Sequence, residues 1–294
     1  MSNLLKVLVT GANGQLARAL CKLAPHNVEL RPVTRAQLDI ADAQAVEAYV
    51  RQLQPDVILN AAAYTAVDKA ESEPEQAAAV NVSGTRNLAL AASRLGQTRL
   101  IHVSTDFVFD GKASRPYAVD AECKPLGVYG RTKREGEIAA INTLGSRALI
   151  VRTSWLYDGA GKNFVLTMLR LMRERGTVRV VSDQIGTPTS TRSLAEMLWR
   201  CVGHSEVSNI YHWSDAGVAS WYDFAVAIAE EARALGLLTS DVNVIPITTS
   251  DYPTPANRPA FSVLDKSKSY ADLNIIPSHW REQLRIVLRE IAHA

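Results

Sequence analysis

The sequence contains little cysteine and no long hydrophobic segment. Its three cysteines, Cys21, Cys123 and Cys201, are scattered and form no Cys-x-x-Cys pair, which excludes a disulfide framework and indicates a reducing compartment. No apolar stretch approaches the roughly 18 residues that a membrane-spanning helix needs. No signal-peptide pattern precedes the first apolar run. We therefore expect a cytoplasmic protein with no membrane partner.

A charge excess of either sign is also missing. The 32 lysines and arginines oppose 30 aspartates and glutamates, and no basic tract is long enough to follow a phosphate backbone, so we expect no nucleic-acid partner. The six histidines show no metal-ligand spacing, so we expect no metal site. The Gly-x-x-x-x-Gly-Lys-Ser/Thr loop of phosphate-binding ATPases is absent as well. What is present is a chain of 294 residues with 47% hydrophobic content, which can bury a large core.

Strand-like and helix-like segments alternate through the first half of the chain. Strands are predicted at residues 4–10, 28–33, 55–60, 99–104 and 148–152. Helices are predicted after the first strand, from a cap at Asp42 to about residue 53, from Glu73-Pro74 to about residue 95, and around Tyr129 and Lys133. This alternation predicts an α/β fold with a Rossmann-type, doubly wound parallel sheet, whose ligands bind at the carboxyl ends of the strands.

A glycine-rich turn follows the first predicted strand. In Gly11-Ala12-Asn13-Gly14-Gln15-Leu16-Ala17, Gly11 can take the tight turn and Gly14 lets the backbone approach a pyrophosphate. Ala17 is small enough for the next helix to pack close to the strand, and the start of that helix offers free N–H groups. The strand–turn–helix context favours dinucleotide binding, and the alternative is an ordinary strand-to-helix turn.

Tyr129 and Lys133 lie one helical turn apart. A phenol ionises near pH 10, and a neighbouring ammonium favours the phenolate, so the pair can exchange a proton with a carbonyl oxygen. The alternative is a solvated helix face, because residues four apart are neighbours on any helix. The glycine-rich turn upstream favours a redox enzyme.

After about residue 155 the alternation loosens, and aromatic and proline-containing segments follow, such as residues 184–189 and 252–259. We expect residues 1–155 to form the dinucleotide-binding Rossmann domain. Residues 156–294 are expected to form mainly a smaller substrate-binding region that is interleaved with the edge of the first domain.

Several motifs in order resemble the extended short-chain dehydrogenase/reductase family over nearly the whole chain, from about Leu4 to Ile291. They are Gly11-x-x-Gly14-x-x-Ala17, residues 60–71, residues 104–111, Tyr129-x-x-x-Lys133, residues 152–155 and Asp183-Gln184-x-Gly186-x-Pro188-Thr189. Within the family the set is most similar to enzymes that reduce the 4-keto group of dTDP-4-dehydro-6-deoxy-L-mannose to give dTDP-L-rhamnose. The sequence departs from the family at Phe107, where a tyrosine is usual, and this removes one hydroxyl that could contact the sugar.

The resemblance implies roles for three catalytic residues. Tyr129 would give a proton to the alkoxide formed at C4 as hydride arrives from the nicotinamide. Lys133 would lower the pKa of the tyrosine and hold the nicotinamide ribose, and Thr105 would hydrogen-bond the carbonyl or the phenol. Ser104 is the rival for this third role. The family places its threonine 24 positions before its tyrosine, and Thr105 meets that count.

The resemblance also implies cofactor contacts. In the glycine-rich turn they are Gly11, Asn13, Gly14, Gln15 and Leu16, of which the last three contact the pyrophosphate. Asp39 and Ile40 would lie at the adenine, and Ala62, Ala63, Tyr64 and Thr65 along the adenosine ribose and nicotinamide half. Tyr129 and Lys133 complete the set. A helix cap is the alternative for Asp39. After the second strand, NAD-binding proteins place an acidic residue, whereas this chain has Thr34-Arg35, which suits a 2′-phosphate. We expect NADPH, with NADH as the alternative.

The expected substrate is a nucleotide sugar. Its predicted contacts are Thr105, Asp106, Trp155, Asn163, Gln184, Thr189 and Arg258, with Trp155 as a flat apolar surface and Arg258 as a partner of the diphosphate. The alternatives are that Trp155 and Trp221 are core aromatics and that Arg258 is one more solvated base.

Other functions stay open at this point. Nucleotide-sugar dehydratases share the glycine-rich turn and the Tyr-x-x-x-Lys pair, but they place a glutamate where this chain has Phe107, which disfavours dehydration. An epimerase would recycle its cofactor, and a regulatory subunit such as the β subunit of methionine adenosyltransferase binds dinucleotide without turnover. Some relatives form Mg²⁺-dependent dimers. A homodimer therefore stays open, although the sequence has no carboxylate cluster that indicates the metal.

Overall fold

A six-stranded parallel sheet forms the centre of the molecule. The structure is a computed structural model that describes residues 4–204 and 210–293. The sheet contains β1 (Leu5–Thr10), β2 (Val28–Val33), β3 (Val57–Asn60), β4 (Arg99–Thr105), β5 (Ala148–Thr153) and β10 (Ile210–His212), in the order β10-β5-β4-β3-β1-β2. Every neighbouring pair is parallel. This confirms the predicted α/β fold, and the five predicted strands lie within two residues of their predicted bounds.

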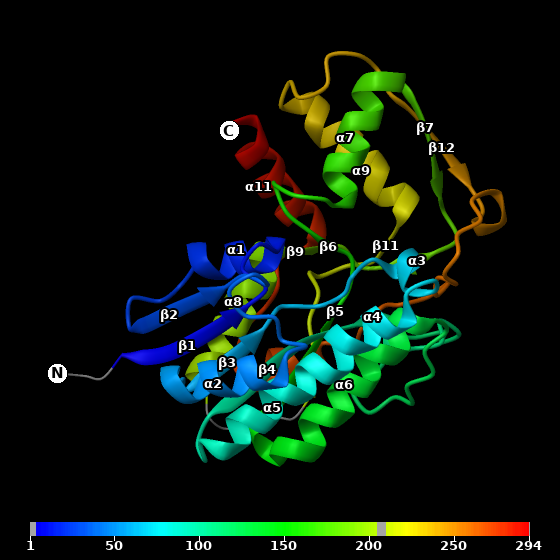
Figure 1. The fold of residues 1–294 in the computed structure, drawn as a ribbon. Coiled ribbons are helices and arrows are strands. Elements are labelled where there is room, and N and C mark those ends of the chain that lie inside the picture. Colours follow the sequence, from blue (N-terminus) through cyan, green and yellow to red (C-terminus); the bar gives the residue numbers. More distant parts are fainter. Residues whose placement is uncertain (1–3, 205–209, 294) are drawn as a thin grey trace.

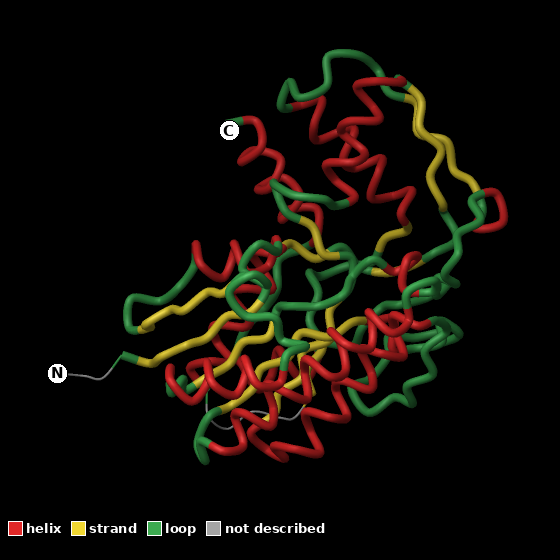
Figure 2. The backbone as a smooth tube through the Cα atoms, in the orientation of Figure 1, coloured by secondary structure: helices red, strands yellow, loops and turns green. Residues whose placement is uncertain are grey.

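Helices cover both faces of this sheet (Figures 1 and 2). One face packs against α1 (Gln15–Lys22) and α8 (Thr191–Gly203), and the other against α2 (Ala43–Leu53), α5 (Thr85–Arg94) and α6 (Val128–Leu144). Residues of β3 and β5 are buried along their whole length. Strands buried on both faces by helices are typical of parallel sheets, and they explain the apolar runs in the sequence.

The helix predicted from residue 73 to about 95 is helical throughout but irregular. It consists of α4 (Pro74–Ala78), a π-helical segment (Ala79–Gly84) and α5. The Asn81 side chain bonds both backbone atoms of Tyr64, with Oδ1 accepting from the Tyr64 N–H at 2.9 Å and Nδ2 donating to the Tyr64 carbonyl at 3.2 Å. The π segment therefore ties the helix to the loop after β3, which is a common use of π-bulges near functional sites.

A second group of elements lies above the sheet in Figure 1. It comprises α7 (Phe164–Arg175), α9 (Trp221–Ala234), α11 (Trp280–Ala292) and the parallel pair β7 (Thr177–Val181) and β12 (Asn243–Ile247), which share an apolar core. The remaining elements are short. They are α3 (Val67–Ala70), the pair β6 (Leu156–Tyr157) and β9 (Thr189–Ser190), the pair β8 (Ile185–Gly186) and β11 (Ala219–Ser220), α10 (Ser267–Leu273), and 3-10 turns at Asp106–Val108, Gly145–Arg147 and Thr249–Asp251.

The chain crosses between these two groups more than once. β10 extends the main sheet next to β5, and α8 packs on α1, although both follow residue 155. How the regions 1–155 and 156–294 divide cofactor and substrate between them stays a prediction. Among the described residues, no helix is both long and apolar enough to cross a membrane.

Candidate active site

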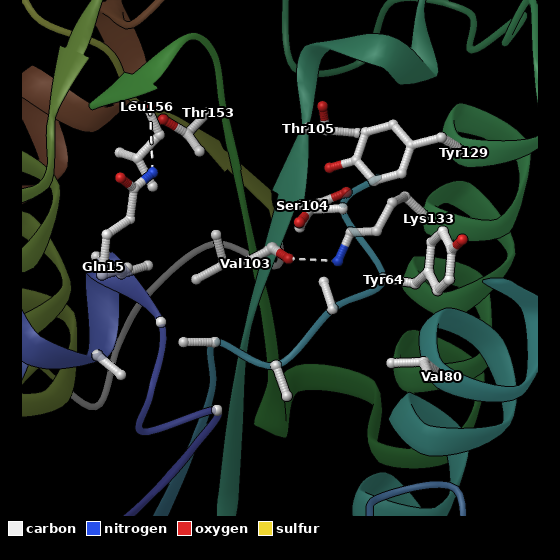
Figure 3. A pocket seen from close by; sticks show the side chains of 18 of the residues that line it. Gln15, Tyr64, Val80, Val103, Ser104, Thr105, Tyr129, Lys133, Thr153 and Leu156 are labelled. Atoms are coloured by element: carbon white, nitrogen blue, oxygen red, sulfur yellow. Dashed lines mark hydrogen bonds between the residues drawn. The ribbon is translucent and has the colours of Figure 1, made fainter. Parts of the chain in front are cut away.

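A cavity of about 710 Å³ opens at the carboxyl ends of β1, β3, β4 and β5. The predicted site residues that line it are Gly11, Asn13, Gly14, Gln15, Leu16, Arg35, Asp39, Ile40, Ala62, Ala63, Tyr64, Thr65, Thr105, Asp106, Tyr129, Lys133 and Trp155. Figure 3 shows Gln15 on one side of this cavity and Thr105, Tyr129 and Lys133 on the other. The fold thus brings together residues that are more than a hundred positions apart in the sequence.

The glycine-rich turn approaches the loop after β3 closely. Gly11 has φ +76°, and a Cβ atom on it would lie 2.9 Å from the Ala62 backbone nitrogen. The Gly14 N–H donates to the Gly11 carbonyl at 2.8 Å, and Gly14 is the N-cap of α1. Only glycine fits at position 11 without a clash with Ala62. The start of α1 lies at the cavity wall, and its free backbone N–H groups favour an anion there.

Arg35 and Asp39 form an ion pair at the rim of the cavity, with Nε of Arg35 donating to Asp39 Oδ2 at 3.0 Å. Asp39 Oδ1 also accepts from the Ala41 N–H at 3.0 Å. Asp42, and not Asp39, accepts from the first N–H groups of α2 and is its N-cap. The alternative interpretation of Asp39 as a helix cap is therefore wrong, and the predicted cap at Asp42 is confirmed.

Tyr129 lies in the first turn of α6, close to the end of β4. A Cβ on the next residue, Gly130, would overlap the Phe107 carbonyl oxygen, so glycine allows this close approach. The ring of Phe107 meets the ring of Tyr129 edge-on, with centroids 5.6 Å apart. Burial raises the pKa of Tyr129 to about 12, with a smaller increase from the Asp106 charge, while a hydrogen bond with the Thr105 side chain opposes both.

Lys133 points at β4. Its Nζ donates to the Val103 carbonyl at 2.7 Å and lies 3.1 Å from Nε2 of His102 (the first contact is drawn in Figure 3). Burial lowers the pKa of Lys133 to about 8, and the Glu137 charge opposes this shift. Burial dominates at both groups and raises the pKa of Tyr129 overall, so the expected lowering of this pKa by Lys133 stays a prediction.

The hydroxyl groups of Ser104 and Thr105 have different surroundings. Ser104 Oγ donates to Oε1 of Glu137 at 2.5 Å, whereas Thr105 Oγ1 donates to Asp106 Oδ1 at 3.0 Å and contacts Tyr129. This geometry favours Thr105 over Ser104 for the third role beside the phenol.

Glu137 is a residue of this site that the sequence prediction missed. It is fully buried and accepts from Nε and Nη2 of Arg152 at 3.0 and 2.9 Å. Its place in the sequence held a signal, because Tyr129, Lys133 and Glu137 follow one another at four-residue intervals on one face of α6.

Asp106 is 2% exposed, and burial raises its pKa to about 6, against hydrogen bonds from Ser262 and Thr105. Its Oδ2 atom has no hydrogen-bond partner of good geometry within the described part of the chain. A buried carboxylate oxygen in this state at a cavity wall can accept a hydrogen bond from a ligand hydroxyl.

Four predicted substrate contacts are not among the residues that line the cavity, so their substrate roles stay predictions. Asn163 is the N-cap of α7, where its Oδ1 accepts from Leu166 N–H at 3.1 Å. Gln184 donates to the Thr249 hydroxyl at 3.1 Å, and Thr189 is buried in the β6–β9 pair. Arg258 forms an ion pair with Asp68 at 2.8 Å. The polar groups of Asn163, Gln184 and Arg258 have partners within the chain, whereas the buried Thr189 hydroxyl has no hydrogen-bond partner among the described residues.

Trp155 lines the cavity and stacks on Trp221, with ring centroids 3.5 Å apart and planes 6° apart. Its φ of +47° is unusual for a bulky residue and is a typical feature of functional sites. Lys162 and Arg18 also line the cavity, and the sequence prediction missed both. Arg18 directly follows the glycine-rich motif, so its position was a usable signal, whereas Lys162 lies in a stretch without a recognised motif.

Comparisons with known proteins identify the family. The model of the RmlD substrate binding domain matches residues 5–293. The chain belongs to the RmlD substrate binding domain family. A dTDP-4-dehydrorhamnose reductase from Aggregatibacter actinomycetemcomitans is 44% identical, over 95% of this chain and 97% of the relative. The spore coat polysaccharide biosynthesis protein SpsK of Bacillus subtilis is 42% identical, over 98% of this chain and 99% of the relative.

A solved structure is also similar. The dTDP-4-dehydrorhamnose reductase of Bacillus anthracis, in complex with NADP, has a TM-score of 0.90 and 36% identity, and the match covers 97% of this chain and 99% of that one. The resemblance that the motifs indicated is therefore confirmed. Among the described residues, no group of three or more histidine, cysteine, aspartate or glutamate side chains is arranged to hold a metal ion.

Proposed function

We propose that this protein is a dTDP-4-dehydrorhamnose reductase, which reduces the C4 keto group of dTDP-4-dehydro-6-deoxy-L-mannose to give dTDP-L-rhamnose. The observation that carries this conclusion is that one cavity joins the glycine-rich turn to Tyr129, Thr105 and Lys133. Sequence comparison also supports the proposal, because reductases of this name are about 40% or more identical to this protein over nearly the whole chain. The expected compartment is the cytoplasm.

The cavity walls fit NADPH. The close approach at Gly11 and the N-terminus of α1 would hold the pyrophosphate, and Arg35 would pair with the 2′-phosphate. Asp39 and Ile40 would lie at the adenine, and residues 62–65 along the remaining ribose and nicotinamide half. When bound, NADPH supplies the hydride that reduces the C4 carbonyl. NADH is the alternative cofactor.

Tyr129 is the proton donor in this proposal. Because its pKa is raised to about 12, the phenol keeps its proton at neutral pH, and it can give that proton to the oxygen at C4 as negative charge develops there. The Thr105 hydroxyl, which donates to Asp106 in this structure, would turn its proton to the phenolate that remains. Lys133 would hold the nicotinamide ribose and return the proton to Tyr129.

Substrate contacts are proposed for two residues that line the cavity. Asp106 would accept a hydrogen bond from a sugar hydroxyl, and Trp155 would provide an apolar surface that Trp221 braces from behind. The proposal does not rely on Asn163, Gln184, Thr189 and Arg258, because none of them lines the cavity. The polar groups of Asn163, Gln184 and Arg258 also bond within the chain.

The alternatives differ at specific residues. A dehydratase would need a proton-abstracting glutamate where Phe107 packs on Tyr129. An epimerase would show no net oxidation of added NADPH. A regulatory subunit would bind NADPH without turnover, and the joint presence of Thr105, Tyr129 and Lys133 in one cavity favours catalysis over that reading.

The test is to supply dTDP-4-dehydro-6-deoxy-L-mannose with NADPH and follow the loss of NADPH absorbance. We expect Tyr129→Phe to reduce kcat about 10²–10⁴-fold, because it removes the acid while keeping the ring. Tyr252→Phe is the matched control, since Tyr252 is 61% exposed on the surface. Equal rates for Tyr129→Phe and the wild type would remove Tyr129 from this role.

A further inference from the structure

Behind Lys133 lies a buried chain of hydrogen-bonding groups that runs across three strands of the main sheet. The Nε2 atom of His102, on β4, lies 3.1 Å from Lys133 Nζ, and its Nδ1 atom lies 3.0 Å from Asn60 Nδ2, at the end of β3. Asn60 Oδ1 accepts from the Thr10 hydroxyl, at the end of β1, at 2.6 Å. These four side chains are at most 1% exposed, so water does not compete for their hydrogen bonds.

The backbone N–H of Ala62 fixes which group donates and which accepts in each of these hydrogen bonds. The backbone N–H of Ala62 can only donate, and it lies 3.2 Å from the Asn60 side chain, so the atom that faces it must be the amide oxygen. The amide nitrogen of Asn60 therefore faces His102 and donates to Nδ1. A neutral imidazole that accepts at Nδ1 carries its proton on Nε2, and here that proton points at Lys133.

Lys133 can accept this bond only as a neutral amine. An ammonium has three donors and no lone pair, so it would place its hydrogens against the Nε2–H of His102. A neutral amine satisfies both contacts, because it accepts from His102 and donates to the Val103 carbonyl. Reversing the Asn60 amide would move the conflict to Ala62 rather than remove it.

We propose that His102 is a positioning residue for Lys133: fixed as its Nε2–H tautomer by Asn60, it docks the neutral amine against β4, and protonation of Lys133 releases the side chain toward the cavity. This inference deepens the proposed function and rests on it, because it assigns two protonation-linked positions to the lysine of the proposed catalytic group.

The charged groups around Lys133 fit two such positions. Tyr129 and Glu137 flank it on α6, His102 faces it from β4, and Asp106 follows β4. Glu137 forms an ion pair with Arg152, and burial is the dominant influence on the pKa of Lys133. Burial lowers the pKa of His102 well below its ordinary value, so the imidazole stays neutral at physiological pH.

The decisive measurement is the tautomer of His102 in protein labelled with ¹⁵N and ¹³C at histidine, read from the ring nitrogen shifts at pH 8–9. We expect Nε2–H at His102. His212 is an internal control of opposite sense: its Nε2 faces the Arg152 guanidinium and its Nδ1 faces the Tyr117 carbonyl, which requires the Nδ1–H tautomer. An Nδ1–H or doubly protonated His102 would overturn the proposal.

Asn60→Asp reverses the direction of the hydrogen bonds at His102 while keeping the shape of the side chain. A carboxylate still accepts from Thr10 and Ala62, but it also accepts from Nδ1–H of His102, which turns Nε2 into an acceptor for the Lys133 ammonium. We expect His102 to change tautomer while His212 does not. We also expect the alkaline limb of kcat/KM to move up by about one pH unit or more, because the ammonium is stabilised. An unchanged tautomer in a folded Asn60→Asp protein would contradict the proposal.

The two proposals can fail separately. If His102 is the Nε2–H tautomer but the protein does not oxidise NADPH with the keto sugar, the proposed function fails and the docking of Lys133 stands. If Tyr129→Phe abolishes reduction but His102 carries its proton on Nδ1, the docking fails and the reductase stands. Should Asn60→Asp not fold, the wild-type spectrum alone decides, because the tautomer is measured there directly.

Discussion

Replacing Glu137 by glutamine should destabilise the protein strongly, although the change keeps the shape of the side chain. Glu137 accepts hydrogen bonds from Ser104, Arg134 and two nitrogens of Arg152, and the exposed fractions of the Glu137 and Arg152 side chains are 0% and 1%. A glutamine places an N–H group against at least one guanidinium and leaves the buried Arg152 charge uncompensated. Breaking a buried ion pair from one side costs about 3–5 kcal/mol of unfolding free energy.

Urea unfolding followed by circular dichroism measures this loss as a lower midpoint at an unchanged slope. Glu135→Gln is the matched control on the same helix. The Glu135 carboxylate pairs with Arg131 at 4.0 Å, and both side chains are about half exposed, so its loss should cost no more than about 0.5 kcal/mol. If Glu137→Gln and Glu135→Gln had equal midpoints, Glu137 and Arg152 would not form a strong buried pair and the reasoning would be refuted.

The effect of Glu137 should also depend on pH in a definite direction. Burial alone raises the pKa of this carboxyl, but the bonds and charge of Arg152, with the bonds from Ser104 and Arg134, lower it overall. A depressed folded pKa gives stability that is fully present above the unfolded value of about 4.3 and is lost as pH falls through the folded value. The difference between wild type and Glu137→Gln should therefore shrink below about pH 4.

Three further changes test the cofactor and proton-donor sites. Gly11→Ala forces a side chain into left-handed backbone 2.9 Å from Ala62, so it should weaken NADPH binding at least about tenfold in a fluorescence titration; unchanged affinity would contradict the assigned turn. Arg35→Ala should raise KM for NADPH about tenfold and leave KM for NADH unchanged, and an unaltered NADPH/NADH ratio would exclude a 2′-phosphate contact. Thr105→Val should lower kcat about 10–100-fold, whereas Ser104→Ala should mainly lower stability because Glu137 loses a bond; the reverse result in steady-state kinetics would exchange the two roles.

Local patterns in the sequence were sufficient for the parallel sheet and the nucleotide-binding turn. The apolar runs that predicted β1, β3, β4 and β5 are strands largely buried between two helical layers. The glycine at position 11 is needed because of the positive φ and the close approach at Ala62. The strands were predictable from their apolar runs, and the turn from glycines three positions apart after the first strand. The contact of Gly11 with Ala62 joins distant segments and was not part of that prediction.

Features set by contacts between distant segments could not be predicted in this way. Arg258 pairs with Asp68 across 190 positions, so a base that was assigned to a diphosphate has a carboxylate partner in the fold. Asn163 is different, because an asparagine directly before a helical pattern is a recognisable N-cap, and that simpler interpretation was available from the sequence. The pKa directions of Tyr129 and Lys133 also depended on burial, which four-residue spacing does not reveal.

The face of α6 that meets the sheet carries ionisable groups where an ordinary helix would carry leucine or alanine. Lys133 is 1% exposed and Glu137 is 0% exposed, and a buried charge destabilises a protein unless it is paired or neutralised. The chain uses both solutions one turn apart: Glu137 is paired with Arg152, and Lys133 rests on neutral hydrogen-bonding groups of β4. A structural helix would gain nothing from this arrangement, since apolar residues of similar volume would pack there at no electrostatic cost. Departures of this kind from local packing rules are expected where function requires them, and this one lies directly behind Tyr129.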